Sequence, residues 1–149
     1  MPGTLTHAPE YILSRLLTSL GLAQDPDVGI TAWPVYYSQE PDLPDRTITI
    51  YGTDGIDDGR TMVDGERQGR HGIQLRVRSE DYDVGFGKVM ELAIALDETV
   101  YGNTVAVGAV TYRVHSFGRT SGPISLGKDS PETKRELFTL NGTLLVREV

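Results

Sequence analysis

The stretch Tyr51–Gly72, YGTDGIDDGRTMVDGERQGRHG, leads directly into the alternating segment Ile73–Ser79, IQLRVRS. Six of its residues are glycines, which reach backbone angles that other residues avoid, and its apolar content is too low for it to fold alone. About twenty residues without structure of their own are uncommon inside a compact domain, so we expect residues 52–72 to be functional. The sequence predicts either a long glycine-rich loop here or an extended hairpin whose tip projects from the domain.

Strands with one apolar face are predicted on both sides of this stretch. Isoleucines alternate with threonines in residues 46–51, and apolar residues alternate with Gln74, Arg76 and Arg78 in residues 73–79. Such alternation is typical of a half-buried strand. The second strand would therefore turn one face toward the core and a cationic face away from it.

Two amphipathic helices are predicted from leucine-rich spacings of three and four residues. The first covers about residues 10–21, with Gly21 as its C-terminal stop. The second covers about residues 82–97, and Asp81 or Asp83 would cap its start. The residues that form the two apolar stripes are Ile12, Leu13, Leu16, Leu17 and Leu20 in the first helix and Val89, Leu92, Ala93 and Leu96 in the second.

The remaining segments have strand composition. Residues 30–37 contain Pro34, which removes a ladder donor and favours an edge strand. Residues 105–107 and 110–117 are β-rich, and residues 118–133 are expected to be a loop. The terminal segment 135–149 contains Asn141–Gly142, which indicates either a hairpin turn or a glycine bulge in one long strand.

These elements predict one α+β domain over residues 1–149, with a single mixed or antiparallel sheet packed by two helices. The length suits one domain. The formal net charge of −7 argues against a nucleic-acid backbone as the main partner, since that requires clustered Lys and Arg. An acidic protein can still line a passage through which DNA slides.

Composition also limits the chemistry and the location. The chain has no cysteine, so it has neither a disulfide framework nor a thiolate nucleophile. The first residues lack a secretory signal, and no apolar stretch is long enough for a membrane span. We expect a protein that stays in the cytosol or is assembled there into something larger.

The sequence shows no catalytic motif, so we predict neither an enzymatic activity nor a cofactor. His7, His71 and His115 are too far apart in the sequence for a local metal motif. The serine in Gly118–Gly122 lacks the spacing of a nucleophile elbow, and Gly85–Val89 lacks the third glycine of a dinucleotide fingerprint.

A carboxylate cluster in the central stretch is the basis of one alternative interpretation, a metal-binding site. Asp54, Asp57, Asp58 and Asp64 could supply oxygen ligands to a hard cation, although the closing Glu of a calcium loop is missing. A metal-dependent hydrolase would use this cluster. A small ligand-binding module is a further alternative, disfavoured because no polar groups converge in the sequence.

The simpler interpretation is that alternating Asp and Arg keep the stretch soluble until it meets another subunit. Arginine suits interfaces because its planar fork makes bidentate contacts with carboxylates. The candidate subunit interface consists of Arg60, Met62, Arg67, Arg70, His71, Gln74, Arg76 and Arg78.

Three segments carry a resemblance to a known family. They are Asp58–Asp97, DGRTMVDGERQGRHGIQLRVRSEDYDVGFGKVMELAIALD, then Val110–Phe117, VTYRVHSF, and Arg135–Val146, RELFTLNGTLLV. Together they resemble the tail-terminator and minor capsid proteins of long-tailed bacteriophages, from about Ile12 to Val146. In this family a glycine-rich loop precedes the strand that reads GIQLRVRS here.

The resemblance implies a structural role in the virion. Such proteins form a homo-oligomeric ring, typically a hexamer, that caps the finished tail tube and presents a surface to the head-side connector. The implied partners are further copies of the chain, the tail tube protein and the connector or neck protein, with DNA passing through and no membrane. Assembly would take place in the host cytoplasm. A neck or head-completion protein is the alternative within the virion.

Overall fold

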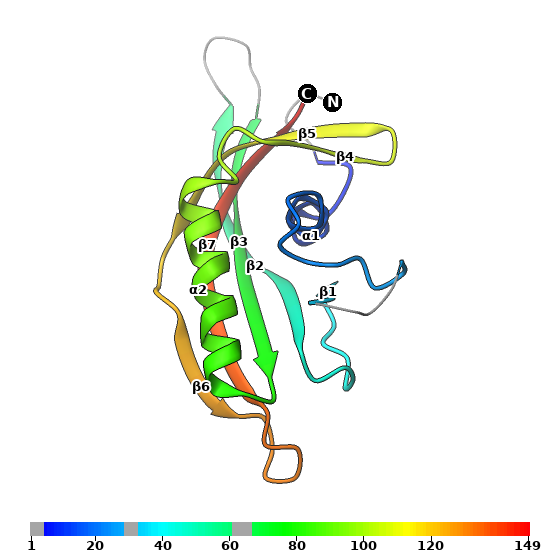
Figure 1. The fold of residues 1–149 in the computed structure, drawn as a ribbon. Coiled ribbons are helices and arrows are strands. Elements are labelled where there is room, and N and C mark those ends of the chain that lie inside the picture. Colours follow the sequence, from blue (N-terminus) through cyan, green and yellow to red (C-terminus); the bar gives the residue numbers. More distant parts are fainter. Residues whose placement is uncertain (1–4, 29–32, 61–66) are drawn as a thin grey trace.

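The computed structural model describes residues 5–28, 33–60 and 67–149, and for 54–60 and 67–69 it describes the backbone alone (Figure 1). The chain forms a helix, three strands, a second helix and four strands, and all of these except the strand at residues 124–128 follow the order that the sequence predicts. The elements are α1 Pro9–Ser19, β1 Val35–Tyr37, β2 Thr47–Arg60, β3 Arg67–Ser79, α2 Tyr82–Glu98, β4 Thr104–Val107, β5 Val110–Arg119, β6 Ile124–Lys128 and β7 Glu136–Glu148.

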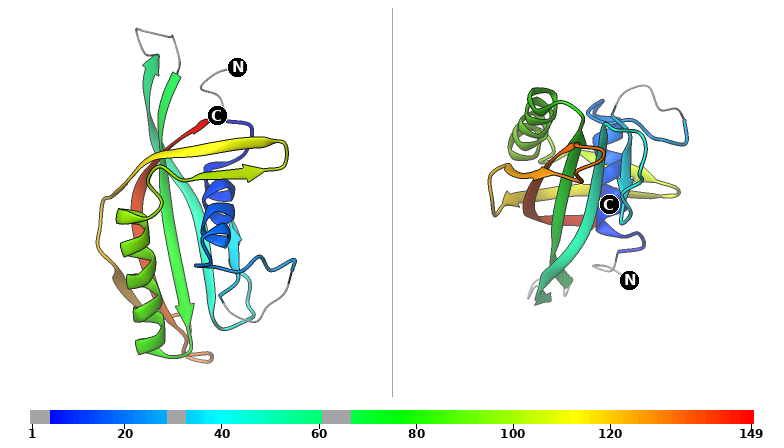
Figure 2. Two further views of the ribbon diagram at one scale, coloured as in Figure 1. Left: turned by 45° about the horizontal axis from the view of Figure 1, so that its top comes forward. Right: turned by 90° about the horizontal axis from the view of Figure 1, so that it is seen from below.

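The seven strands make one mixed sheet with the order β1-β2-β3-β7-β5-β4. β1 runs parallel to β2, and the other neighbours are antiparallel. β6 also pairs with β7, so β5 and β6 share one edge of that strand. The sheet curls around α1, as Figures 1 and 2 show, and this curvature brings β1, β2 and β4 to the same helix.

Both helices pack on one face of this sheet. Gly85 of α2 lies against the Phe138 ring of β7, and Gly52 of β2 lies against the Glu10 carboxylate of α1. The cross-strand register places Phe138 and Gly52 on the same face, since paired residues and residues two apart share a face. The opposite side of the sheet, which we name the open face, carries the polar residues of the same strands.

The core confirms the apolar stripes of the sequence. Both helices and the alternating apolar positions of β2, β3, β5 and β7 meet in one cluster of buried side chains. The helix ends also follow the predicted signals. Gly21, just beyond α1, has a φ of 77°, and the Asp81 carboxylate accepts a hydrogen bond of 3.1 Å from the Val84 N–H at the start of α2.

The glycine-rich stretch is strand wherever the structure describes it. β2 continues to Arg60 and β3 begins at Arg67, and the two pair from Thr47–Arg78 outward with two register shifts. The hairpin alternative therefore describes this part of residues 52–72, and an unstructured loop does not. Residues 61–66 lie outside the described residues.

The C-terminal segment is one continuous strand, so of the two alternatives at Asn141–Gly142 the single long strand is confirmed, without the bulge, and the hairpin turn is wrong. Gly142 pairs with Ile73 on one side and Arg119 on the other, and no register shift occurs there. A Cβ at Gly142 would lie 2.5 Å from the Phe117 ring, so the glycine permits a close approach rather than a turn or bulge.

The predicted loop at residues 118–133 also needs correction. Residues Ile124–Lys128 form β6, which pairs with the first part of β7. All residues of this short strand are exposed. Because it has no buried face, its sequence lacks the alternation of apolar and polar residues that is typical of a half-buried strand.

Candidate subunit interface

The structure divides the predicted interface residues of β3 between two faces of the sheet. Arg70, Gln74, Arg76 and Arg78 belong to the open face, and His71 belongs to the helix face. Arg70 is exposed, whereas Gln74 and Arg76 are half-buried and Arg78 is only 2% exposed. The alternation of the strand explains this division.

Other predicted residues cannot be placed. The side chains of Arg60 and Arg67 and the whole of Met62 lie outside the described residues. The same holds for the candidate metal ligands, namely the side chains of Asp54, Asp57 and Asp58 and all of Asp64. Among the described residues no group of three or more potential ligands could hold a metal ion.

His71 faces α1 rather than a free surface. Burial lowers the pKa of its imidazole, while the nearby Glu10 carboxylate acts in the opposite direction. The half-buried ring thus favours its neutral form. His71 therefore stays a predicted interface residue that is only partly exposed.

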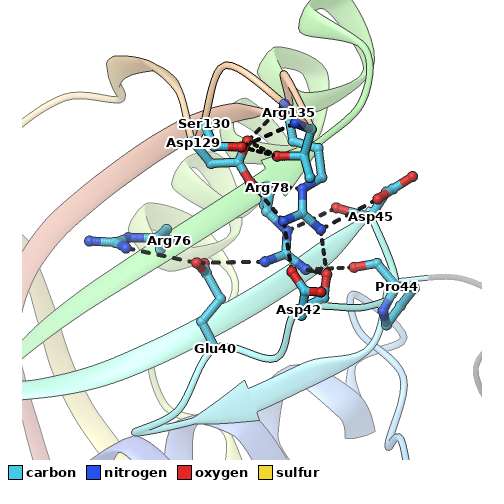
Figure 3. Close-up of polar contacts among 10 residues, drawn as sticks. Glu40, Asp42, Pro44, Asp45, Arg76, Arg78, Asp129, Ser130 and Arg135 are labelled. Carbon is cyan, nitrogen blue, oxygen red and sulfur yellow. Dashed lines mark hydrogen bonds and ion pairs between the residues drawn. The ribbon is translucent and has the colours of Figure 1, made fainter.

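A buried guanidinium organises the end of the open face. The Arg78 side chain donates to the carbonyl oxygens of Pro44 at 2.7 Å, Asp42 at 3.1 Å and Asp45 at 3.3 Å (Figure 3). Burial lowers the pKa of Arg78, and the neighbouring Arg135 charge acts in the same direction. These carbonyl contacts replace the water that a buried cation loses.

A second buried guanidinium lies beside it. Arg135, 5% exposed, donates from Nε to the Asp129 carboxylate at 2.7 Å and also contacts the Asp42 carbonyl. Burial disfavours the ionised form of Asp129, but hydrogen bonds from Thr133 and Arg135 outweigh this effect and lower the pKa of Asp129 from 3.8 to about 2. Asp129 therefore stays ionised as the partner of Arg135.

Glu40 completes this group, which we name the ionic cluster: Glu40, Asp42, Asp45, Arg76, Arg78, Asp129 and Arg135. The Glu40 carboxylate lies 3.7 Å from Arg78 and 3.9 Å from Arg76, whose guanidinium also lies 5.5 Å from the centre of the Tyr51 ring. The cluster holds residues 40–45 across the β2–β3 part of the open face (Figure 3).

Sequence reasoning missed the ionic cluster. Its contacts to residues 40–45 join positions that are 33 to 93 residues apart along the chain. The strand pattern indicated a cationic face on β3, but nothing in the pattern identified the segment that would cover part of that face. Arg78 and Arg76 consequently contact their own chain, and the other members of the predicted set remain the proposed interface.

A groove of about 610 Å³ lies between α1 and β1 and bears on the ligand-binding alternative. Its polar lining includes Arg15 and Asp25, which pair with each other at 2.8 Å, and Tyr36, whose pKa is raised by burial. Arg15 and Asp25 satisfy one another, so the further charged group of the described lining is the Asp27 carboxylate. Neither described helix has the length and apolar character required to cross a membrane.

The fold combines a curled sheet, two helices on one face and a long pair of strands that carries part of the predicted interface. A family model described as "Bacteriophage tail terminator protein" matches residues 16–141. The chain therefore belongs to the bacteriophage tail terminator family and is a structural protein of the phage tail.

Comparison with other proteins adds distant likenesses. No curated protein sequence matches the chain. A solved structure titled "Virion of native gene transfer agent (GTA) particle" shares 12% identity over 76% of this chain and 78% of that chain, with a TM-score of 0.42. Another solved structure shares 20% identity over 94% of this chain and 89% of that chain, with a TM-score of 0.45.

Proposed function

We propose that six copies of the chain form a ring that caps the completed tail tube, stops its growth and joins it to the head-side connector. The family match over residues 16–141 carries this proposal, because it includes both faces of the sheet, all of α2 and the paired strands β2 and β3. Heterologous contacts between neighbouring copies would close the ring.

The β2–β3 pair is the proposed contact arm toward a tube subunit or a neighbouring copy. It carries Arg60, Met62, Arg67 and Arg70 of the predicted interface, whose arginines can form bidentate contacts with carboxylates. Fixing chain residues in one conformation costs roughly 1 to 2 kcal/mol per residue, so contacts around the whole ring must offset the cost of docking.

The ring would allow DNA to pass without holding it. The net charge of −7 supports this part of the proposal, because like charges along a passage repel the phosphate backbone. We also propose that the protein has no enzymatic activity and that the ring assembles on the tail in the host cytoplasm.

Tail length in a phage with a null allele tests the function. Negative-stain electron microscopy should show tails of irregular and excessive length, because nothing would stop polymerisation of the tube. Complementation with the native gene should restore the normal length and attached heads.

Two other outcomes would overturn the terminator role. Tails of normal length beside unattached, DNA-filled heads would place the protein at the neck, as a head-completion protein. Normal infectious particles would remove the assembly role and return attention to a hydrolase that uses Asp54, Asp57, Asp58 and Asp64; calorimetry with calcium, magnesium and manganese would then test metal binding.

A further inference from the structure

We propose that strand β6 of one copy pairs with strand β1 of the next copy, so that the sheets of neighbouring copies join edge to edge. This contact rests on the proposed ring and deepens it by naming the two strand edges that would meet. The partner of the β1 edge is thus a second copy of this chain.

At the level of β1 the sheet consists of five strands, with β1 and β6 outermost. Thr139 of β7 pairs with Ile124 of β6 on one side and with Arg76 of β3 on the other. Arg76 pairs in turn with Thr49 of β2, which is the partner of Tyr36 in β1. One row of paired residues therefore crosses the sheet, and β1 and β6 lie at its opposite ends (Figure 1).

β6 has an unpaired outer edge. It pairs with β7 alone among the described strands, and all five of its residues are exposed. The Asn141 carbonyl of β7 accepts a hydrogen bond from the Thr120 N–H, so Asn141 and, two residues away, Thr139 direct their backbone groups toward β5 and β6. Ile124, the partner of Thr139, therefore bonds to β7. The next residue, Ser125, directs its N–H and C=O outward.

β1 has an outer edge of the same kind. The Ser38 N–H donates to the Ile50 carbonyl of β2 at 2.8 Å, and Tyr36, two residues earlier, directs its backbone groups to β2 as well. The intervening Tyr37 consequently directs its N–H and C=O away from β2. Within the described chain, these two groups of Tyr37 have no hydrogen-bond partner.

A proline keeps this edge open. Gln24 forms a single parallel bridge to Pro34, in which the Gln24 N–H donates to Trp33 at 2.7 Å and the Val35 N–H donates to Gln24 at 3.0 Å. To continue the bridge, residue 26 would have to donate an N–H to the Val35 carbonyl, but Pro26 has none. The edge of β1 beyond Val35 is therefore left for another strand.

The groove of about 610 Å³ between α1 and β1 gives such a strand room. Its lining includes both Tyr36 and Tyr37, whose side chains lie on opposite faces of β1, so the groove follows the strand edge itself. The Tyr37 ring is 48% exposed, with its centre 4.7 Å from that of Tyr11. Ile124 and Leu126 of β6, 43% and 48% exposed, offer apolar side chains that these rings can cover.

The directions and faces of the two edges also match. β1, β2 and β7 run in one direction and β6 runs in the other, so β6 meets the β1 of an identically oriented copy as an antiparallel neighbour. Tyr37 shares the helix face with its partner Ile50, and Ser125 shares it with its partner Phe138. A pair of Tyr37 and Ser125 would thus keep the helices of both copies on one side of the joined sheet.

One chain carries both halves of this contact, which selects a second copy as the partner. Each copy would give β6 to one neighbour and accept the β6 of another at β1. Such a head-to-tail contact is heterologous and can close into a ring. It depends on backbone groups, which pair whatever the charge of the side chains.

Disulfide trapping in assembled phage particles tests the pairing. The chain has no cysteine, so Tyr37→Cys and Ser125→Cys introduce the only thiols of this protein. Directly opposed residues of a hydrogen-bonded antiparallel pair have Cα atoms about 5.5 Å apart, which suits a disulfide. Oxidation of the double variant should give a ladder of covalent multimers, with a peptide that joins residues 37 and 125 in its mass spectrum. Neither single variant should give a ladder.

The matched control moves one thiol to the neighbouring residue. Tyr36→Cys combined with Ser125→Cys places the two thiols on opposite faces of the joined sheet, so this pair should give no joined peptide.

A proline substitution tests the same edge without cross-linking. Ser125→Pro removes the outward N–H and should leave the monomer folded, because proline is tolerated in an edge strand where its nitrogen faces solvent. In null phage it should nevertheless give overlong tails, whereas Ser125→Thr keeps the N–H and should give tails of normal length. Circular dichroism checks the fold of both variants, and unfolding of Ser125→Pro would contradict the outward direction of this N–H.

Several results would overturn the proposal. Thiols of the Tyr37→Cys and Ser125→Cys double variant that stay free after oxidation would exclude the pairing, as would normal tails in Ser125→Pro phage. Dimers of the Ser125→Cys single variant would show that β6 pairs with β6, and equal cross-linking of the Tyr36→Cys control would exclude the register. If the null phage has overlong tails in these cases, the ring proposal stands and only its assigned edges fail. A joined peptide together with normal tails in the null phage would instead keep the contact and remove the terminator role.

Discussion

Two glycines of α2, two residues apart, have opposite structural roles. A Cβ at the buried Gly85 would lie 2.8 Å from the Phe138 ring and 3.1 Å from the Ser79 Cβ. At the exposed Gly87 a Cβ would meet no atom within 4 Å. Gly85 thus permits the close packing of helix and sheet, whereas Gly87 only increases the entropy of the unfolded chain.

Alanine substitutions should separate these two roles. We expect Gly85→Ala to lower the free energy of unfolding by about 1 to 3 kcal/mol through overpacking. Gly87→Ala should raise it by roughly 0.5 to 1 kcal/mol through helix propensity. Urea denaturation followed by circular dichroism measures both values, and equal effects of the same sign would contradict the packing argument.

Part of the free energy of unfolding depends on the ionisation of Asp129, so it changes with pH in the acid range. Its pKa is depressed in the folded protein, from 3.8 to about 2, so its contribution is fully present above pH 4 and is lost as the pH falls toward 2. The shift corresponds to about 2 kcal/mol. The destabilisation caused by Asp129→Asn should therefore shrink between pH 4 and pH 2 in urea denaturation, whereas a difference that does not change with pH would exclude this linkage.

At the scale of elements, the ionic cluster fixes residues 40–45 against the sheet. We expect Arg78→Met to lower the free energy of unfolding by about 3 to 5 kcal/mol, because it leaves carbonyls and Glu40 without their buried cation. Arg46→Met is the matched control: Arg46 pairs with Glu80 at 2.7 Å on the surface, where such a pair contributes about 0 to 1 kcal/mol. Guanidinium denaturation measures both free energies of unfolding. If Arg78→Met and Arg46→Met lower this free energy by similar amounts, burial does not strengthen the Arg78 contacts.

The elements also show how far the sequence could predict the fold. Both helices and the alternating strands follow from periodicity, because each buries one face in the same core. β2 and β3 continue through a glycine-rich stretch since ladder hydrogen bonds join backbones, whatever the side chains. Local propensity therefore favoured a loop where pairing between strands determined the outcome.

The candidate site was less predictable than the fold for a similar reason. The charge and alternation of β3 indicated its cationic face, but the burial of Arg78 depends on Asp42, Pro44 and Asp45, more than thirty residues earlier. At Asn141–Gly142, a turn signal was outweighed by the packing of Phe117 over the glycine. In both cases a contact between distant segments decided the role of the residue.

At the scale of the whole molecule, we expect the outer part of the β2–β3 pair to be separable from the rest of the domain. Removal of residues 56–68 leaves five residues to connect the paired Thr53 and Gly72, a common hairpin loop length.

Deletion of residues 56–68 should therefore leave a folded monomer but prevent attachment of tails to heads. Circular dichroism and thermal unfolding would measure the first part, and electron microscopy of complemented null phage would measure the second. An unfolded product would contradict the separation of arm and core, and attached tails would contradict the proposed role of the arm.

Arg78 recognises the segment of residues 42–45 through carbonyl oxygens, which every amino acid possesses. Leu43, 71% exposed, takes no part in these carbonyl contacts, whereas the carboxylates of Asp42 and Asp45 pair with Arg135. At position 43 the path of the backbone and the identity of the side chain are therefore set separately. In related tail proteins, substitutions at this position could thus change the exposed surface, and with it the partner that the surface binds. The backbone path of the segment would stay the same.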